Sequence, residues 1–189
     1  MKKKSEKITE KQAEELLKKY APDLKTYQKI LQHSQAVKRV ALTFAQAIQK
    51  QGHKVDLNLI KTGSLLHDLG RFTCPPKTKD SLKHGFLGGK ILRKEGLPQH
   101  ARIAETHLGA GISKEEIIQQ KLPLPKRNFL PRTIEEKIIA YVDNLVFGDR
   151  LGTVQEVVER FKKEIPSALP RLIKLHNEIE KLRGGLQFL

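Results

Sequence analysis

The stretch that most constrains this chain runs from Gly63 to Arg71 and reads GSLLHDLGR. Its apolar residues end abruptly in two adjacent ionisable side chains, His67 and Asp68, and Gly70 then offers a natural end to a helix. Burying such a pair is costly unless something compensates it. A divalent metal would do so, because neutral imidazole and carboxylate are both good metal ligands. The stretch alone leaves a second interpretation open, in which His67 is a cation in a last helical turn and Asp68 begins a turn.

The composition is typical of a globular chain. The 189 residues suit one domain with a core, and 38% hydrophobic and 30% charged residues exclude a disordered chain. No apolar run approaches the roughly 20 residues of a membrane span, so we expect no membrane partner. Residues 1–4 are basic but are followed by polar residues instead of the apolar region of a signal peptide. A single cysteine, Cys74, excludes an internal disulfide and fits the reducing cytoplasm, where we expect the protein.

The charge is strongly unbalanced. The formal net charge of +15 favours polyanionic partners such as nucleotides, phosphorylated metabolites or nucleic acid. The competing interpretation is a solubilising surface, because many lysines stand beside glutamates on helix faces. The low aromatic content of 5%, without tryptophan, argues against platforms on which single strands stack.

Helical patterns follow one another along almost the whole chain. The glycines near residues 85–89 are costly inside a helix, by about 1 kcal/mol each relative to alanine, which indicates close packing of another element or a ligand. We find neither strand-like alternation nor internal repeats, and therefore expect an all-α fold, a single bundle with a C-terminal helical tail. Amphipathic spacing and capping residues predict helices near residues 9–20, 24–51, 56–69, 84–94, 99–107, 113–120, 133–146, 153–163 and 170–182.

Four further polar residues interrupt apolar patterns or border them. His33 lies in the apolar stripe of the segment 24–51, and Asp143 lies in the apolar helix that begins near residue 133. His84 and His107 stand at helix edges beside glycines. Each of these alone is more often a core residue or a cap, but together they are readily explained by convergence on a metal.

The order of these residues resembles a known family. His33, the His67-Asp68 pair and Asp143, on separate helices, are similar to the metal ligands of the HD-domain superfamily of metal-dependent phosphohydrolases. The match includes their surroundings, GSLLHDLGR and the Tyr141-Val142-Asp143 segment, and covers about residues 31–150.

The two remaining histidines resemble those of the dinuclear branch of this superfamily. His84 lies in KHGFLGGKIL and His107 in ETHLGAG. That branch includes bacterial diadenosine-tetraphosphate hydrolases and the HD-GYP cyclic-dinucleotide phosphodiesterases. The chain has no GYP segment after His107, and the segment after Asp143 is only loosely like that of the diadenosine-tetraphosphate enzymes.

The resemblance implies a specific metal centre. One metal would be held by His33, His67, Asp68 and Asp143, and Asp68 could bridge to a second metal held by His84 and His107. His67, Asp68, His84 and His107 would be the catalytic set. The nitrogen-rich second site favours Fe, Mn, Co, Ni or Zn, with Mg also compatible. If only one metal binds, His84 and His107 would instead face the phosphate of the substrate.

The resemblance also implies a domain division. We expect residues 1–22 to form an N-terminal helix packed on the core, residues 23–150 the HD-type metal-binding domain, and residues 151–189 C-terminal helices of the same globular unit. The oligomeric state is left open.

Basic residues near the implied ligands are candidates for holding substrate phosphate: Arg71, Lys83, Lys90 and Arg150. For each of them, simple surface solvation is the competing interpretation. His100 lies two turns before His107 and is a further ligand candidate. His53 and His176 are expected to be exposed.

The function that these features imply is hydrolysis of a phosphoester or phosphoanhydride bond in a nucleotide-like substrate by metal-activated water. Two alternatives stay open. One is a di-iron oxygenase on the same fold, and the other is a non-enzymatic basic helical module that binds RNA or DNA.

Overall fold

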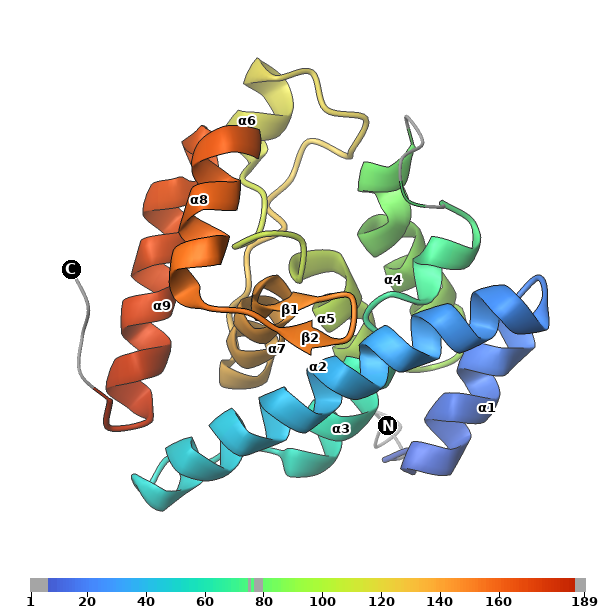
Figure 1. Ribbon diagram of the computed structural model, residues 1–189. Helices are drawn as coiled ribbons and strands as arrows, with labels where there is room; N and C mark the ends of the chain where they lie inside the picture. The colour runs from blue at the N-terminus through green and yellow to red at the C-terminus, as the bar shows by residue number, and fades with distance from the viewer. Residues whose placement is uncertain (1–6, 75, 77–79, 186–189) are drawn as a thin grey trace, which may run out of the picture.

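The computed structural model describes residues 7–74, 76 and 80–185 (Figure 1). Residues 1–6, in which we looked for a targeting signal, lie outside the described residues. Within the described residues, almost all regular structure is helical, which confirms the all-α class. The elements are α1 (Glu10–Tyr20), α2 (Leu24–Lys50), α3 (Leu57–Leu66), η1 (Leu69–Phe72), η2 (Ser81–Lys83), α4 (His84–Lys94), α5 (Pro98–Thr106), α6 (Lys114–Gln119), α7 (Ile134–Leu145), β1 (Val146–Phe147), β2 (Arg150–Leu151), α8 (Val154–Glu164), η3 (Pro166–Ala168) and α9 (Leu169–Leu182).

One small hairpin departs from the sequence prediction. Strands β1 and β2 pair antiparallel, with Val146 opposite Leu151 and Phe147 opposite Arg150. Strands of two residues are too short to give the alternation by which a strand is recognised. Gly148 has a φ of +69° in the connecting turn, a conformation that costs glycine little.

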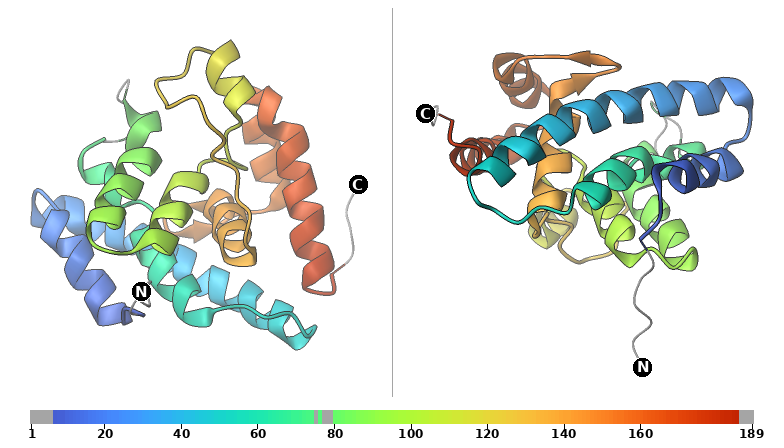
Figure 2. Two further views of the ribbon diagram at one scale, coloured as in Figure 1. Left: turned by 180° about the vertical axis from the view of Figure 1, so that it is seen from behind. Right: turned by 90° about the horizontal axis from the view of Figure 1, so that it is seen from below.

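The long helix α2 crosses the molecule, and α1, α3 and α7 pack against it (Figures 1 and 2). Asp23 caps its first turn by accepting a hydrogen bond from the backbone N–H of Thr26, at 2.8 Å. Residues of α2 contribute to both apolar clusters of the core. Val37, Ala41 and Ala45 belong to the cluster shared with α3, α7, α8 and α9, and Ile30 belongs to the one shared with α1, α3, α4 and α5.

The helix that carries the His-Asp pair ends earlier than the sequence indicated. Asp56 caps α3, but the helix stops at Leu66, so that His67 is its C-cap and Asp68 begins a turn into η1. Gly70 is not a left-handed helix cap, which corrects that expectation. A Cβ atom at Gly70 would instead overlap the backbone carbonyl oxygen of His84, because η1 packs directly against α4.

Close packing also explains the other glycines of α4, as the sequence predicted. A Cβ atom at Gly85 would lie 2.6 Å from the carbonyl oxygen of Ala104, and one at Gly89 would lie 2.5 Å from Glu105 Cγ. Gly88 faces the backbone of Gly70. Helix α4 therefore sits between η1 and α5 at distances that only glycine permits.

The tail helices α8 and α9 pack against α7 at one side of the bundle (Figure 1). His176 of α9 is buried, with 6% of its surface exposed, and its Nδ1 lies 2.7 Å from the hydroxyl of Tyr141 on α7. The expectation of an exposed His176 was therefore wrong. The polar residues around it in sequence hid the fact that its own face of α9 turns to the core. His53 is exposed, as expected.

Among the described residues, no helix combines the length and apolar character needed to cross a lipid bilayer.

The packing of η1 against α4 makes a stability prediction. Replacing Gly70 with alanine should lower the free energy of unfolding by about 3 kcal/mol or more, because the added methyl group has no space. The matched control is Gly52→Ala, where φ is +86° but nothing lies within 4 Å of the added atom. That control should cost only about 1 kcal/mol. Equal losses for the two variants in urea denaturation would contradict this close contact.

Candidate metal centre

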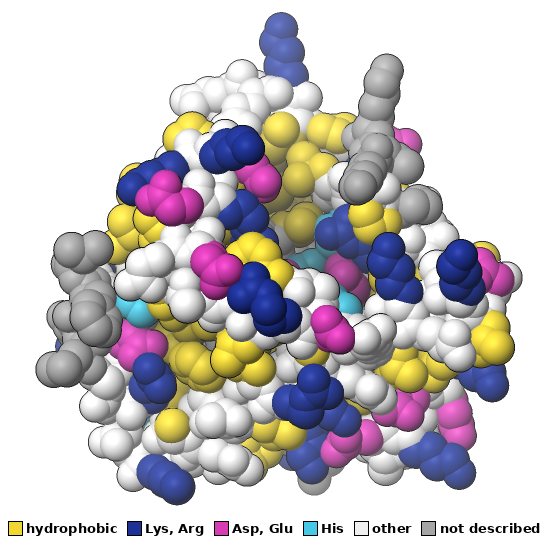
Figure 3. Space-filling view, viewed as in Figure 1, with side chains coloured by type: hydrophobic (Ala, Val, Ile, Leu, Met, Phe, Trp, Pro, Cys, Tyr) yellow, Lys and Arg dark blue, Asp and Glu magenta, His cyan; other side chains and the backbone are white. Residues whose placement is uncertain are grey.

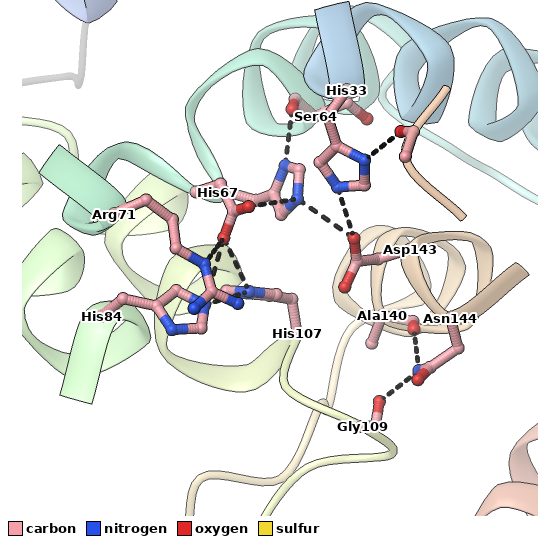
Figure 4. Close-up of polar contacts among 12 residues, drawn as sticks. His33, Ser64, His67, Arg71, His84, His107, Gly109, Ala140, Asp143 and Asn144 are labelled. Carbon is pink, nitrogen blue, oxygen red and sulfur yellow. Dashed lines mark hydrogen bonds and ion pairs between the residues drawn. The ribbon is translucent and has the colours of Figure 1, made fainter. Parts of the chain in front are cut away.

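Five elements bring the predicted ligands to one place (Figure 4). His33 comes from α2, the His67-Asp68 pair from the end of α3, His84 from the first residue of α4, His107 from the end of α5 and Asp143 from α7. His67, Asp68, His84 and His107 are buried, and His33 and Asp143 are partly buried. Two overlapping groups, His33-His67-Asp143 and His67-Asp68-His107, each have ligand atoms within 4.8 Å of one another.

Every histidine of the centre is held by the backbone in the same way. Nδ1 lies 2.6 Å from the carbonyl oxygen of Gly148 for His33, 2.7 Å from that of Ser64 for His67, 2.6 Å from that of Ser81 for His84 and 2.8 Å from that of Ala104 for His107. A carbonyl oxygen only accepts hydrogen bonds, so each Nδ1 carries the proton that it donates. This arrangement orients each ring and leaves Nε2 to face the centre, as in metal-ligating histidines.

Asp143 forms the first half of the centre. Its Oδ1 lies 3.0 Å from Nε2 of His33 and 3.2 Å from Nε2 of His67. His67 Nε2 is fully buried and makes no hydrogen bond of good geometry within the described chain. A buried polar nitrogen without such a bond indicates a partner of another kind.

Asp68 joins this half to the second one. Its Oδ2 faces His67 Nε2 at 4.0 Å, and its Oδ1 faces Nε2 of His84 at 3.1 Å and of His107 at 3.4 Å. The two Nε2 atoms of His84 and His107 are only 3.0 Å apart. If both rings donate through Nδ1, two lone pairs point at each other and at a carboxylate, which is favourable only with a cation between them.

The electrostatics of the centre point the same way. Burial raises the pKa of Asp68, but the imidazoles of His67, His107 and His84 outweigh it and hold that pKa well below its usual range. The pKa of Asp143 is likewise lowered well below its usual range, because contacts with His33 and His67 outweigh its burial. Both carboxylates are therefore anionic at neutral pH.

The negative charge of Asp143 changes the pKa values of the two imidazole rings that it contacts, those of His33 and His67. Burial lowers the pKa of His33, but the carboxylate of Asp143 outweighs it and raises the pKa to about 9. The pKa of His67 is raised as well, since Asp68 and Asp143 outweigh its burial. Protons on these Nε2 atoms supply positive charge at the same positions where a metal cation would. The donor set of imidazole nitrogens and carboxylate oxygens fits divalent transition metals.

The centre lies at the bottom of a depression in the face seen in Figure 3, with lysine and arginine side chains around it. A cleft of about 330 Å³ opens onto it. Arg71 lines this cleft beside Asp68, and its Nε lies 3.3 Å from Asp68 Oδ1. Lys29 and Asp149, which sequence reasoning did not single out, also line it.

The other three cations predicted to hold phosphate have partners of their own. Lys83 of η2 pairs with Asp80, which directly precedes η2, and Lys90 lies over the ring of Phe86 at 5.8 Å. Arg150 pairs with Glu156 at 2.8 Å. Among the four candidates, Arg71 has the contact with the metal centre, and the phosphate-binding roles of all four stay predictions.

His100 does not join the cluster, contrary to its consideration as a ligand. It is buried, and its Nε2 lies 2.8 Å from Oγ1 of Thr62 on α3. Spacing of two turns along α5 places His100 and His107 on similar faces of that helix. His100, however, meets Thr62 of α3, whereas His107 meets Asp68, which follows the end of α3. The spacing alone could not distinguish these neighbours.

Sequence reasoning also missed the residues that fix the centre from outside. Asn144 donates to the carbonyl oxygens of Gly109, at 2.6 Å, and Ala140, at 2.7 Å, and so ties the loop after His107 to the helix that carries Asp143. Its own Oδ1 accepts from Arg160 of α8 at 2.9 Å. The one available signal was a polar residue directly after Asp143 in an apolar helix.

Glu105 provides a second such support. It is buried two residues before His107, and its two carboxylate oxygens accept hydrogen bonds from Arg93, at 2.6 and 2.7 Å. Arg127 adds a third bond, at 2.7 Å. This network connects α5 with α4 and with the proline-containing loop that precedes α7.

The sequence model of the HD domain matches residues 30–148, which span all six residues of the centre. The chain belongs to the HD domain family. This finding confirms the resemblance seen in the sequence and agrees with groups of histidine and aspartate that could hold a metal.

Curated relatives extend the similarity beyond this segment. An uncharacterized protein of Methanocaldococcus jannaschii is 41% identical over 157 residues, covering 81% of this chain and 89% of the relative. Two proteins named tRNA (cytidine(56)-2'-O)-methyltransferase also match: that of Thermoplasma volcanium is 37% identical and that of Picrophilus torridus 38%. The matches cover 82% of this chain but only 43% and 42% of those relatives, so the chain corresponds to less than half of each methyltransferase.

A solved structure shares the fold. The HD domain of the Listeria monocytogenes phosphodiesterase PgpH superposes with a TM-score of 0.57 at 21% identity, covering 91% of this chain and 93% of that one. The same domain in complex with cyclic-di-AMP gives the same TM-score, with 92% of each chain covered.

The burial of His100 predicts a pH dependence of stability. Burial lowers its pKa to about 4 from the ordinary 6.5, so the folded ring stays neutral where the unfolded ring binds a proton. Because the unfolded state binds more protons, stability should fall by up to about 3 kcal/mol as pH drops from about 6.5 to 4. Urea denaturation across this range measures the effect.

The control for this prediction is His100→Gln, which keeps a hydrogen-bonding group near Thr62 but does not titrate. Subtracting its pH profile from that of the native protein removes the contribution of the other titrating groups, which the two proteins share. Identical profiles for the two proteins would show that His100 is not a buried neutral ring.

Proposed function

We propose that this protein is a metal-dependent phosphohydrolase that cleaves a phosphoester or phosphoanhydride bond in a nucleotide-like substrate. The observation that carries the proposal is the position of Asp68, which has the imidazole of His67 on one of its oxygens and those of His84 and His107 on the other. Membership of the HD domain family agrees with it. The PgpH domain bound to cyclic-di-AMP supports the substrate class by analogy, as a fold relative that binds a nucleotide.

The donor set fits two divalent transition-metal ions. His33, His67, Asp68 and Asp143 would hold one, and Asp68, His84 and His107 the other. When bound, such ions lower the pKa of an attacking water and stabilise the charge that develops on phosphate oxygens. The four backbone carbonyls keep each ring in the tautomer that presents Nε2, and so prepare the centre before substrate arrives.

The cleft would hold the anionic substrate. Arg71 stands where its guanidinium can donate to a phosphate oxygen while staying within reach of Asp68. Lys29, which also lines the cleft, adds positive charge. We therefore assign Arg71 the main phosphate contact, with Lys83, Lys90 and Arg150 as peripheral cations.

Metal analysis and a phosphate-release screen test this proposal together. Purified protein should contain about two equivalents of transition metal per chain and release phosphate from one or more nucleotides, dinucleoside polyphosphates or sugar phosphates. His84→Ala combined with His107→Ala should reduce the metal to about one equivalent, and Asp68→Asn should abolish activity, which means a loss of about 100-fold or more.

His53→Ala is the matched control, because His53 is an exposed histidine that belongs to neither group of possible metal ligands. Circular dichroism checks that each variant is folded. An Asp68→Asn variant with native activity and full metal content would refute the proposal. Oxygen uptake with an organic substrate, in the absence of phosphate release, would favour the di-iron oxygenase alternative instead.

A second candidate substrate is a phosphoester in RNA. Two observations favour it: the net charge of +15, and the similarity of this chain to part of two enzymes that are named for action on tRNA. Positive charge attracts any polyanion, and the cleft is open to the surface.

Salt dependence distinguishes this candidate from a small nucleotide. If RNA is the substrate, binding of a labelled tRNA to the His67→Ala variant should persist and weaken by about 10³-fold or more between 50 and 200 mM salt. Fluorescence anisotropy measures the affinity, and a neutral polymer of similar size is the control. Absence of tRNA binding at low salt would remove RNA as a substrate while leaving the phosphohydrolase proposal in place.

A further inference from the structure

A second cavity lies between the tail helices and α7, away from the metal centre. It has a volume of about 560 Å³ and is lined by residues of α7, α8 and α9. This size is within the range of small-molecule sites in proteins. Its apolar wall consists of Leu145, Val154, Val157, Val158, Leu172 and Ile173.

A pair of buried polar side chains lines the same cavity. The hydroxyl of Tyr141 lies 2.7 Å from Nδ1 of His176. Nε2 of His176 is buried and has no hydrogen-bond partner among the described residues. His176 is only 6% exposed, so bulk water does not readily replace the missing partner.

The charged groups of the cavity are already paired. Arg183 donates to Glu180 Oε2 through Nε at 2.8 Å and through a second nitrogen at 2.6 Å. Lys162 pairs with Glu159, also at 2.8 Å. The walls therefore offer no unpaired charge to His176.

The hydrogen-bond inventory fixes which nitrogen of His176 carries its proton. Burial raises the pKa of Tyr141 and lowers that of His176, so that both are neutral at pH 7. If the hydroxyl donates to Nδ1, one buried group stays unsatisfied, namely Nε2–H. If Nδ1 donates to the hydroxyl, two are unsatisfied, the O–H and the lone pair of Nε2. Each unsatisfied buried group destabilises the fold, so the first arrangement, which leaves fewer of them, is favoured.

We propose that this cavity binds a small, mostly apolar molecule with a hydrogen-bond acceptor, such as a carbonyl or carboxylate oxygen, that accepts from Nε2–H of His176. The apolar wall takes the body of the ligand, and the acceptor satisfies the buried donor of His176, which has no partner among the described residues. A purely apolar occupant, or a protein surface that merely covers the groove, would leave this donor unsatisfied. The site is independent of the proposed phosphohydrolase activity.

Displacement of a fluorescent probe tests the proposal on the full chain. The dye 8-anilinonaphthalene-1-sulfonate has an aromatic body and an acceptor group, and it should bind saturably. Decanoate and decylammonium share one chain length but differ in the head group, and decanoate alone offers an acceptor. Decanoate should displace the dye about tenfold better than decylammonium.

Variants assign that preference to this cavity. Val158→Trp fills the space and should weaken dye binding by about tenfold or more. His176→Phe should abolish the preference for decanoate, whereas His176→Gln, which keeps an N–H donor, should retain part of it. The chain is basic overall and therefore attracts anions in general. Loss of the preference for decanoate in His176→Phe would show that the preference comes from the histidine, because this variant keeps the positive charges of the chain.

The control is Leu24→Trp, at an apolar position that is 63% exposed and belongs to α2. It should leave dye binding unchanged, and thermal melting checks that all variants are folded. Unchanged dye binding in Val158→Trp, or an unchanged head-group preference in both His176 variants, would overturn the proposal. A change from dimer to monomer in Val158→Trp by light scattering would also overturn it, because the face would then be covered by a second copy.

Discussion

The buried carboxylate of Asp68 is the group on which the arrangement of this protein depends. One of its oxygens faces His67 and the other faces His84 and His107, while Oδ1 of Asp143 faces both His33 and His67. Two anionic groups in a largely buried site need positive charge between them. The carbonyl contacts of the four histidines orient each Nε2 toward the centre, the same orientation that backbone contacts give to metal-ligating histidines.

Small residues make this geometry attainable. Glycines at positions 70, 85 and 89 let η1, α4 and α5 approach more closely than any side chain would allow. That approach brings Nε2 of His84 within 3.0 Å of Nε2 of His107. Polar supports then hold the elements in place: Glu105 joins α4 to α5, and Asn144 joins α7 to the loop after His107. The geometry of the centre therefore depends on the close packing of the backbone around it.

The tail helices have a different physical character from the metal centre. Where α4 and α5 pack without space, α8 and α9 leave a cavity beside α7 that contains a buried, unsatisfied donor. Arg160 of α8 donates to Asn144, next to Asp143, and Arg171 of α9 donates to the carbonyl oxygens of Ala110 and Gly111, so the tail is nevertheless connected to the centre. The molecule therefore combines a tightly packed polar centre with a looser apolar region.

The sequence by itself determined the helices, their caps and the identity of the residues that converge, because amphipathic spacing and polar interruptions of apolar faces are local features. It placed most helices to within a few residues and singled out His33, His67, Asp68, His84, His107 and Asp143. Only the tertiary structure decided which neighbours those residues meet: that Asp68 lies between two histidine sets, that His100 contacts Thr62, and that His176 is buried against Tyr141. The tiny β1–β2 hairpin, whose turn holds His33, was likewise invisible beforehand. The reason is that periodicity specifies which face of a helix is buried, whereas the partner of each buried group is set by how separate helices pack in three dimensions.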